Sequence, residues 1–322
     1  MTRRLAGPLA GLLGLCCLWS TPSAATQSAA PQQPSTFRGS SELVRVFATV
    51  LDKDGRLVTT LTKDQFELRD DGKPQPLTLF DNTPQPIKLI EMLDVSGSME
   101  GNLPILREAS DALFTRLRPD DLVRVGAFGH EVKISEPFTN DIRDLRAFVP
   151  RYIAPDAPTP LWHALEEAIA GFGKEQDERR AILVMTDGKD TGAIGIGGFG
   201  RHVPSQGGVI DRARDADTMI YAVGMRSRQR PHGQTDMRAM MLDDLPDPGL
   251  AKVAEETGGG YLEIHGGEDL SSAFAHVADE LHGQYLLGYV PPKRDGKVHS
   301  IDVRVTDKSL KPRARKNYVA PK

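Results

Sequence analysis

The stretch IKLIEMLDVSGSM at residues 87–99 decides how this chain folds. Residues 87–93 form a mainly apolar stretch of strand length, and Asp94, Ser96 and Ser98 follow directly after it. An open α/β sheet places its ligand site at the carboxyl end of such a strand. One carboxylate and two hydroxyls in a tight loop can converge on one hard cation, because such a cation prefers oxygen ligands.

Strand and helix patterns alternate from Pro86 to about residue 282. The near-continuous apolar run at residues 181–186 is typical of a strand that is buried on both faces of a parallel sheet. This alternation of strands and helices predicts an α/β fold, with a doubly wound, mostly parallel sheet flanked by helices. The expected strands are 87–93, 122–128, 181–186, 219–223 and 261–264, and the expected helices lie within 103–117, 142–148, 161–172, 209–213, 248–257 and 270–281.

At both ends of the mature chain, apolar residues recur at every second position instead, which is typical of strands. Apolar residues alternate over 43–50 and again over 301–305, and residues 285–290 read as a further strand. Asp-Gly pairs at 54–55, 71–72 and 295–296 are hairpin turn signals. Since each set of strands is too small to be stable alone, we expect the two ends to pair into one small β unit.

Residues 1–25 have the layout of a secretory signal peptide, with Arg3 and Arg4 before an apolar stretch and small residues at 23–25. An uncleaved anchor is the alternative, and a lipoprotein signal is disfavoured because Leu15 precedes Cys16. Cleavage would remove Cys16 and Cys17, the only two cysteines, and with them any disulfide or Cys-based zinc site. We expect an exported protein, periplasmic, envelope-bound or extracellular, with no membrane span in the mature chain.

The expected organisation is a signal peptide at 1–25, a disordered linker at 26–41, β strands at 42–85, the α/β domain at 86–283 and β strands at 284–322. The chain has 322 residues, with 40 basic against 44 acidic side chains and a formal net charge of −4. This balance argues against a nucleic-acid partner. We interpret the basic segment 311–316 as a solvated edge.

Motifs of the common enzyme classes are incomplete. Residues 195–200 spell G-x-G-x-x-G, but no helix starts inside the motif, as a dinucleotide site requires. His130-Glu131 begins a zinc-protease motif, but Ile134 stands at the position of its second histidine. The sequence contains neither a P-loop nor a G-x-S-x-G nucleophile motif, so we expect no enzyme activity.

Two later loops add oxygen ligands to the first. Thr159 precedes the helix at 161–172, and Asp187 follows the buried strand at 181–186. All three loops are expected at one edge of the sheet, so the predicted metal ligands are Asp94, Ser96, Ser98, Thr159 and Asp187. The expected ion is Mg²⁺ or Mn²⁺. The alternatives are a serine that only caps the following helix and a site that has lost its metal affinity.

Residues 86–282 resemble the von Willebrand factor type A domains, whose metal-ion-dependent adhesion site combines D-x-S-x-S, a later Thr and an Asp after the fourth strand. The resemblance implies that a protein partner's Asp or Glu carboxylate completes the metal shell. The segments 46–50, 61–66, 71–76 and 285–289 resemble the exported bacterial "VWFA-related" family of acidobacteria.

The alternative function is a structural or assembly component of the cell envelope, in which the metal only stabilises the fold. We interpret Lys189 and Asp190 as solvated loop charges, while Trp162 and His163 are assigned either to helix packing or to partner contact. The loops at 190–208 and 226–247 are long enough to be either functional or disordered.

Overall fold

Six strands form the sheet that carries the candidate site, in the order β10-β9-β8-β5-β6-β7. The computed structural model describes residues 43–173, 178–192, 203–226, 245–265 and 269–322. Neighbouring strands are parallel except β7, which is antiparallel to β6 and was not predicted. The predicted mostly parallel sheet is confirmed. Its strands are β5 (Lys88–Asp94), β6 (Leu122–Phe128), β7 (Val132–Ile134), β8 (Arg180–Thr186), β9 (Thr218–Met225) and β10 (Tyr261–Ile264).

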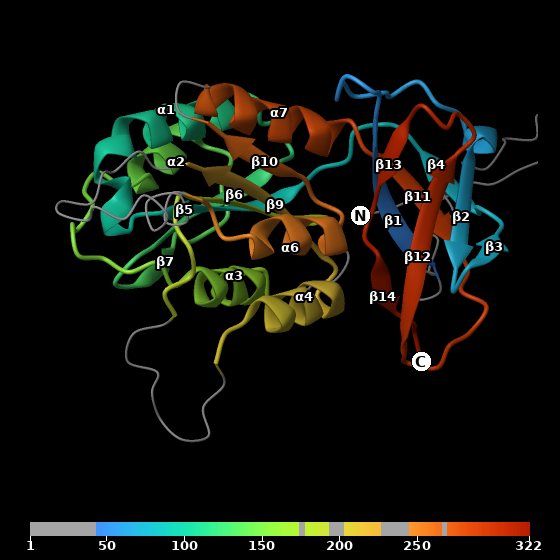
Figure 1. Ribbon diagram of the computed structural model, residues 1–322. Coiled ribbons are helices and arrows are strands. Elements are labelled where there is room, and N and C mark those ends of the chain that lie inside the picture. Colours follow the sequence, from blue (N-terminus) through green and yellow to red (C-terminus); the bar gives the residue numbers. More distant parts are fainter. Residues whose placement is uncertain (1–42, 174–177, 193–202, 227–244, 266–268) are drawn as a thin grey trace, which may run out of the picture. The chain divides into compact units, whose positions relative to one another are not determined.

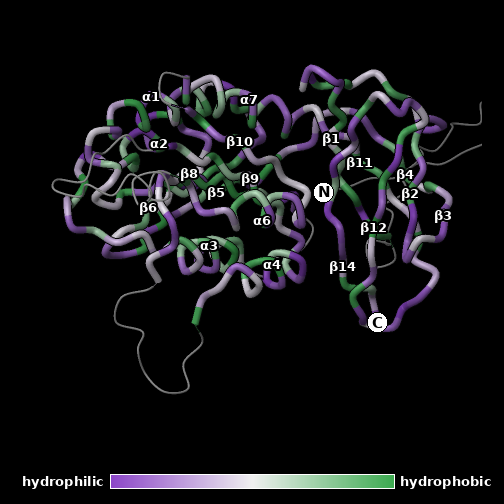
Figure 2. Tube along the Cα trace, in the orientation of Figure 1, coloured by the Kyte–Doolittle hydropathy of each residue, from purple (hydrophilic) through white to green (hydrophobic). Residues whose placement is uncertain are grey.

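Helices cover both faces of this sheet (Figure 1). Residues on β5 alternate between two cores, with Leu89 and Leu93 on the side of α1, α2 and α7 and with Ile90 and Met92 on the side of α3, α4 and α6. Figure 2 shows the resulting concentration of apolar residues on β5, β8 and β9. The helices are η2 (Gly97–Asn102), α1 (Leu103–Phe114), α2 (Ile142–Phe148), α3 (Leu161–Ala170), α4 (Gln206–Asp215), α6 (Gly249–Thr257) and α7 (Leu270–His282).

Strands from the two ends of the described chain pair with one another, as expected. Antiparallel pairing joins β1 to β11 and β2 to β12, with Val46 opposite Leu287 and Leu68 opposite Val303. Two four-stranded sheets, β13-β1-β11-β4 and β14-β12-β2-β3, share one apolar core. Their elements are β1 (Val44–Leu51), η1 (Lys63–Gln65), β2 (Phe66–Asp70), β3 (Lys73–Gln75), β4 (Leu79–Asp81), β11 (Tyr285–Tyr289), β12 (Val298–Val305), β13 (Lys311–Arg313) and β14 (Asn317–Val319).

Two of the Asp-Gly turn signals have different outcomes. Asp71 and Gly72 form the two-residue loop between β2 and β3, and both have positive φ, at 47° and 77°. This is the conformation of a type I′ hairpin turn. Asp295-Gly296 does not close a hairpin, because β11 and β12 on either side of it belong to different sheets. The prediction was wrong there because a turn signal does not specify which strands pair.

The basic segment 311–316 is not the solvated edge that we expected. Its first residues form β13, which pairs with β1. Arg313 donates to Glu280 on α7, and Arg315 donates to Asp217 just before β9. The Arg315 side chain is only 14% exposed. These arginines therefore make ion pairs between the β strands and the α/β part of the chain.

Several sequence predictions concern residues outside the described ranges. They are the signal peptide at 1–25, the linker at 26–41, the G-x-G-x-x-G motif at 195–200 and most of the long loops. Among the described helices, none has the length and apolar character needed to cross a membrane.

Candidate metal centre

Asp94 ends the central strand β5 and is completely buried. Its Oδ1 accepts a 2.7 Å hydrogen bond from the backbone N–H of Ser96, and its Oδ2 accepts one from the hydroxyl of Thr186. Burial, together with the neighbouring Asp187 carboxylate, raises the pKa of Asp94 to about 7. The carboxylate is therefore held in a fixed orientation, in a place that favours a compensating positive charge.

Ser96 and Ser98 connect the first loop to the end of β8. Their hydroxyl oxygens lie 3.1 Å apart, and the Ser98 hydroxyl donates a 2.6 Å hydrogen bond to Oδ1 of Asp187. Ser96 precedes the 3₁₀ helix η2, but its side chain makes no capping hydrogen bond there. The capping interpretation of this serine therefore has no geometric support.

Thr159 reaches the same region from the segment before α3. The backbone N–H of Gly97 donates to the Ala157 carbonyl at 3.0 Å, which holds this segment against the first loop. A side chain at Gly97 would collide with the Pro155 carbonyl oxygen, because a Cβ atom there would lie only 1.9 Å from it, so the close approach requires glycine. The Thr159 hydroxyl lies beside Gly188, 3.1 Å from the place that a Cβ atom of that residue would take.

The five predicted residues thus meet at one edge of the sheet. Hydrogen bonds connect Asp94 to Ser96, Ser96 to Ser98 and Ser98 to Asp187. The Thr159 side chain lies beside Gly188, the residue that follows Asp187. The donor set consists of carboxylate and hydroxyl oxygens, which suits a hard divalent cation.

Asp187 gives the most direct indication that this site fits a cation. The residue is 1% exposed, and its Oδ2 is buried without a hydrogen-bond donor in the described structure. Burial also raises the pKa of Asp187 above its ordinary value. An unpaired buried carboxylate oxygen is costly. A cation beside Oδ2 would supply the missing partner.

Sequence reasoning did not assign a role to Thr186. This last residue of β8 donates to Oδ2 of Asp94 and accepts a 3.1 Å hydrogen bond from the Gly188 backbone N–H. It therefore orients one carboxylate and the loop that carries the other. The only sequence signal was its position immediately before Asp187 at a strand end.

The predictions for Asp190 and Trp162, which lie near the candidate site, have opposite outcomes. Asp190 is not a solvated loop charge, because its carboxylate accepts backbone N–H groups of Trp162 and Gly192, at 3.3 and 3.1 Å. Its own N–H donates to Asp247 at 3.1 Å. The interpretation was wrong because backbone donors from α3 lie beside this loop only in the folded chain. Trp162 is 8% exposed and belongs to the apolar core under α3, so its packing role is confirmed.

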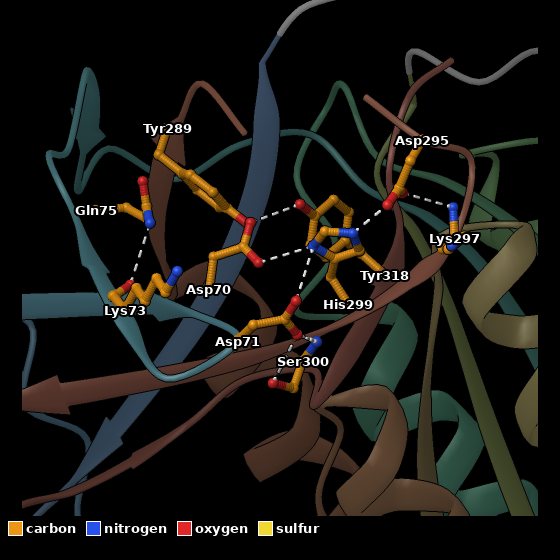
Figure 3. A network of polar contacts seen from close by, with 10 residues as sticks. All are labelled: Asp70, Asp71, Lys73, Gln75, Tyr289, Asp295, Lys297, His299, Ser300 and Tyr318. Carbon is orange, nitrogen blue, oxygen red and sulfur yellow. Dashed lines mark hydrogen bonds and ion pairs between the residues drawn. The ribbon is translucent and has the colours of Figure 1, made fainter. Parts of the chain in front are cut away.

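A second cluster of acidic residues lies among the β strands (Figure 3). Nδ1 of His299 is 3.0 Å from Oδ1 of Asp70 and 3.3 Å from Oδ2 of Asp71, and Nε2 is 3.2 Å from Oδ1 of Asp295. The hydrogen bond with Asp70 is the main reason that the pKa of His299 is raised.

Two tyrosines complete this network. The hydroxyls of Tyr289 and Tyr318 both donate to Oδ2 of Asp70, at 2.9 and 2.7 Å. Three ligand atoms of Asp70, Asp71 and His299 are close enough to share a metal ion. The raised pKa of His299 favours its positively charged form, however, and each of its ring nitrogens faces a carboxylate. We therefore interpret the cluster as an ion-pair network of the β strands, which the sequence did not reveal.

One family model matches a segment of the α/β part. Residues 89–189 match the family model of the von Willebrand factor type A domain. A search of curated proteins found no match.

Solved structures give weaker likenesses. An aerotolerance-related membrane protein from Bacteroides fragilis is 18% identical, with coverage of 61% of this chain and 98% of that chain and a TM-score of 0.44. A von Willebrand factor type A protein from Catenulispora acidiphila is 11% identical, with coverage of 89% and 76% and a TM-score of 0.46. Proximal thread matrix protein 1 from the mussel byssus, solved with zinc in its metal site, is 14% identical, with coverage of 67% and 50% and a TM-score of 0.45.

Proposed function

Because residues 89–189 match the family model of the von Willebrand factor type A domain, we propose that this protein binds a protein partner through a divalent cation. The cation is Mg²⁺ or Mn²⁺, and an Asp or Glu carboxylate of the partner occupies its open coordination position. The chain is exported by residues 1–25 and acts as a binding protein, without catalysis. The proposed ligands are Asp94, Ser96, Ser98, Thr159 and Asp187.

The buried Oδ2 of Asp187 is the single observation that most supports this proposal. It lies at the carboxyl edge of the sheet, beside a second buried carboxylate, and no donor satisfies it within the described residues. The Asp187 charge also raises the pKa of Asp94, so the two carboxylates destabilise each other. A divalent cation would relieve both costs at once.

The number of protein oxygens supports an open site. Mg²⁺ takes six oxygens at about 2.1 Å and usually keeps several waters. Five protein groups, some of them acting through water, leave a position that a carboxylate can take. One carboxylate–metal bond in water is not enough for stable association, so the surrounding surface has to contribute contact area.

Exposed apolar side chains are available for that contact. Ile105 on α1 is 46% exposed, and Phe148 at the end of α2 is also 46% exposed. Tyr152, in the segment that leads to Thr159, is 75% exposed. Large side chains of this kind are frequent anchors of protein interfaces.

Metal binding is tested by titration calorimetry of Mg²⁺, Mn²⁺ and Zn²⁺ into the chelator-treated chain. Asp187→Asn should abolish the binding. The matched control is Asp307→Asn, because Asp307 is an exposed aspartate that only accepts hydrogen bonds from Ser309. Absence of binding by the wild-type chain would contradict the proposal.

Partner binding needs a second experiment. The wild-type chain and Asp187→Asn are immobilised and exposed to cell-envelope extract, with 5 mM Mg²⁺ (about the level that fills a hydrated Mg²⁺ site) or with EDTA. A partner retained only by the wild-type chain in Mg²⁺ supports the proposal. If the metal binds and raises the melting temperature, but capture does not depend on it, the structural alternative is supported instead.

A further inference from the structure

A cavity of about 340 Å³ lies at the opposite edge of the central sheet from the candidate metal centre. The first residues of four parallel strands line it, namely Lys88, Leu122, Arg180 and Thr218. Asp94 and Asp187, in contrast, lie at or just after the carboxyl ends of β5 and β8. Strands β1 and β11 close the cavity from the other side through Phe47 and Leu286. Its volume is within the range of small-molecule sites.

The lining of the cavity carries more positive than negative charge. Six basic and four acidic side chains line it, and some of them compensate one another. Lys88 forms an ion pair with Glu178, and Arg315 forms one with Asp217. Within the described ranges, no carboxylate lies within ion-pair distance of Arg179 or Arg180. Two adjacent arginines at one cavity therefore have no ion-pair partner among the described residues, and Asp121 is the carboxylate that acts on Arg179 from a longer distance.

Arg180 has fewer hydrogen-bond acceptors than Arg179 among the described residues. It is 4% exposed, yet its Nε and Nη2 have no acceptor in the described structure. Its remaining contacts are a long 3.4 Å hydrogen bond from Nη1 to the Ala216 carbonyl and the ring of Phe172, centred 5.7 Å from Cζ. Nε and Nη2 form one edge of the guanidinium group, which is the edge that binds a carboxylate or phosphate through two parallel hydrogen bonds.

Arg179 adds a second charge with a fixed position. Its Nη2 donates to the Leu281 carbonyl at 2.5 Å and to Gln284, and Phe47 lies 4.7 Å from Cζ. Burial lowers the pKa of Arg179 to about 10, so that it is still charged at neutral pH. The Nε of Arg179 is also buried, with no acceptor among the residues that the structure describes.

We propose that this cavity binds a small organic oxyanion, a carboxylate or a phosphate monoester, with Arg180 as its anchor and Arg179 as a second positive charge. The apolar body of the ligand packs against side chains such as Ile87, Leu122 and Met219, which also line the cavity. An unpaired buried guanidinium is costly. An anion that takes up its free donors is therefore the expected occupant.

Binding is tested with phenyl phosphate, benzoate and the neutral benzyl alcohol, by calorimetry and thermal shift at constant ionic strength. EDTA is present throughout, so that the candidate metal centre makes no contribution. At least one anion should bind and raise the melting temperature, whereas benzyl alcohol should not. The preferred anion distinguishes a phosphate from a carboxylate ligand. If neither anion binds better than the alcohol, the proposal is overturned.

Arg180→Met keeps the apolar stem and removes the donors, so anion affinity should fall at least tenfold. Its anion-free melting temperature should not fall, because an uncompensated buried charge is lost. If Arg180→Met fails to fold, Arg180→Lys serves instead, because it keeps the charge but loses the two-donor edge and should also bind more weakly. The control is Arg143→Met, since the Arg143 side chain is 87% exposed. Unchanged anion affinity in the folded Arg180 variant would overturn the assignment.

Discussion

The hydroxyl of Ser98 donates a 2.6 Å hydrogen bond to Oδ1 of Asp187, across 89 residues of sequence. This bond orients the Asp187 carboxylate and leaves its Oδ2 as the oxygen that has no donor in the described part of the chain. The orientation is built into the fold before any cation binds. Preorganisation of this kind is what a specific ligand site requires.

Asp187→Asn should remove the stabilisation that Mg²⁺ gives to the wild-type chain. At a hundredfold excess of ligand over Kd, binding adds about 2.7 kcal/mol, or roughly 5 °C in melting temperature for a domain of this size. The metal-free variant should melt no lower than the metal-free wild type, because a buried charge is removed and the amide oxygen can still accept from Ser98. Scanning calorimetry in Mg²⁺ and in EDTA measures both effects. An equal Mg²⁺ shift in the variant would exclude Asp187 from the site.

Thr186→Val should weaken metal binding although Thr186 is not a proposed ligand. The valine cannot donate to Oδ2 of Asp94 or accept from the Gly188 N–H. Loss of such a supporting hydrogen bond lowers metal affinity by about 10- to 100-fold and stability by about 1–3 kcal/mol. Thr186→Ser keeps the hydroxyl and should restore most of the affinity in Mn²⁺ titrations. Wild-type affinity in Thr186→Val would show that the hydroxyl has no supporting role.

Glu91→Gln should make the protein more resistant to alkaline conditions. Glu91 is completely buried in β5, and burial raises its pKa from 4.5 to about 8. Between these two values the unfolded chain has lost this proton and the folded chain has kept it, so wild-type stability falls as pH rises.

Glutamine does not ionise and avoids this loss. The advantage of Glu91→Gln should therefore grow from pH 5 to pH 8, reaching on the order of 3 kcal/mol at about 1.4 kcal/mol per pKa unit. Urea unfolding at the two pH values measures it, with the exposed Glu108→Gln as control. A stability difference that does not change with pH would argue against a protonated Glu91.

His299→Gln should destabilise the β strands most at low pH. The pKa of His299 is raised, with the hydrogen bond to Asp70 as the largest cause. The stabilisation from its positive charge is therefore fully present below the unfolded-state pKa of about 6.5, and it is lost as pH rises through the raised pKa. At pH 6 the variant should lose about 1–3 kcal/mol, the usual effect of leaving a buried acceptor unsatisfied.

The difference between wild type and His299→Gln should be smaller at pH 9 than at pH 6, because the wild-type imidazole loses its charge as pH rises through the raised pKa. Denaturant unfolding at both pH values tests this, with His130→Gln as control because the His130 side chain is 51% exposed. A larger difference at pH 9 than at pH 6 would contradict the ion-pair interpretation.

Much of the fold was predictable because its signals are local. The alternation of strand and helix patterns along residues 86–282 predicted a mostly parallel sheet, and the Asp71-Gly72 pair predicted a hairpin turn. The spacing of Asp94, Ser96 and Ser98 within one loop identified the candidate site for the same reason. Each of these features depends on residues within a few positions of one another.

The remaining features depend on residues that are distant in sequence, and only the tertiary structure decided them. Asp70 and His299 are 229 residues apart, and Arg315 reaches Asp217 across 98 residues. No periodicity encodes such pairs, so a basic segment was interpreted as solvated and Asp190 as a free loop charge. The amino acid sequence by itself determined which oxygen ligands are available. Folding decided that, among the described residues, one oxygen of Asp187 has no donor and the buried Nε and Nη2 of Arg180 have no acceptor. Both results follow from burial, which removes the water that would otherwise satisfy these groups.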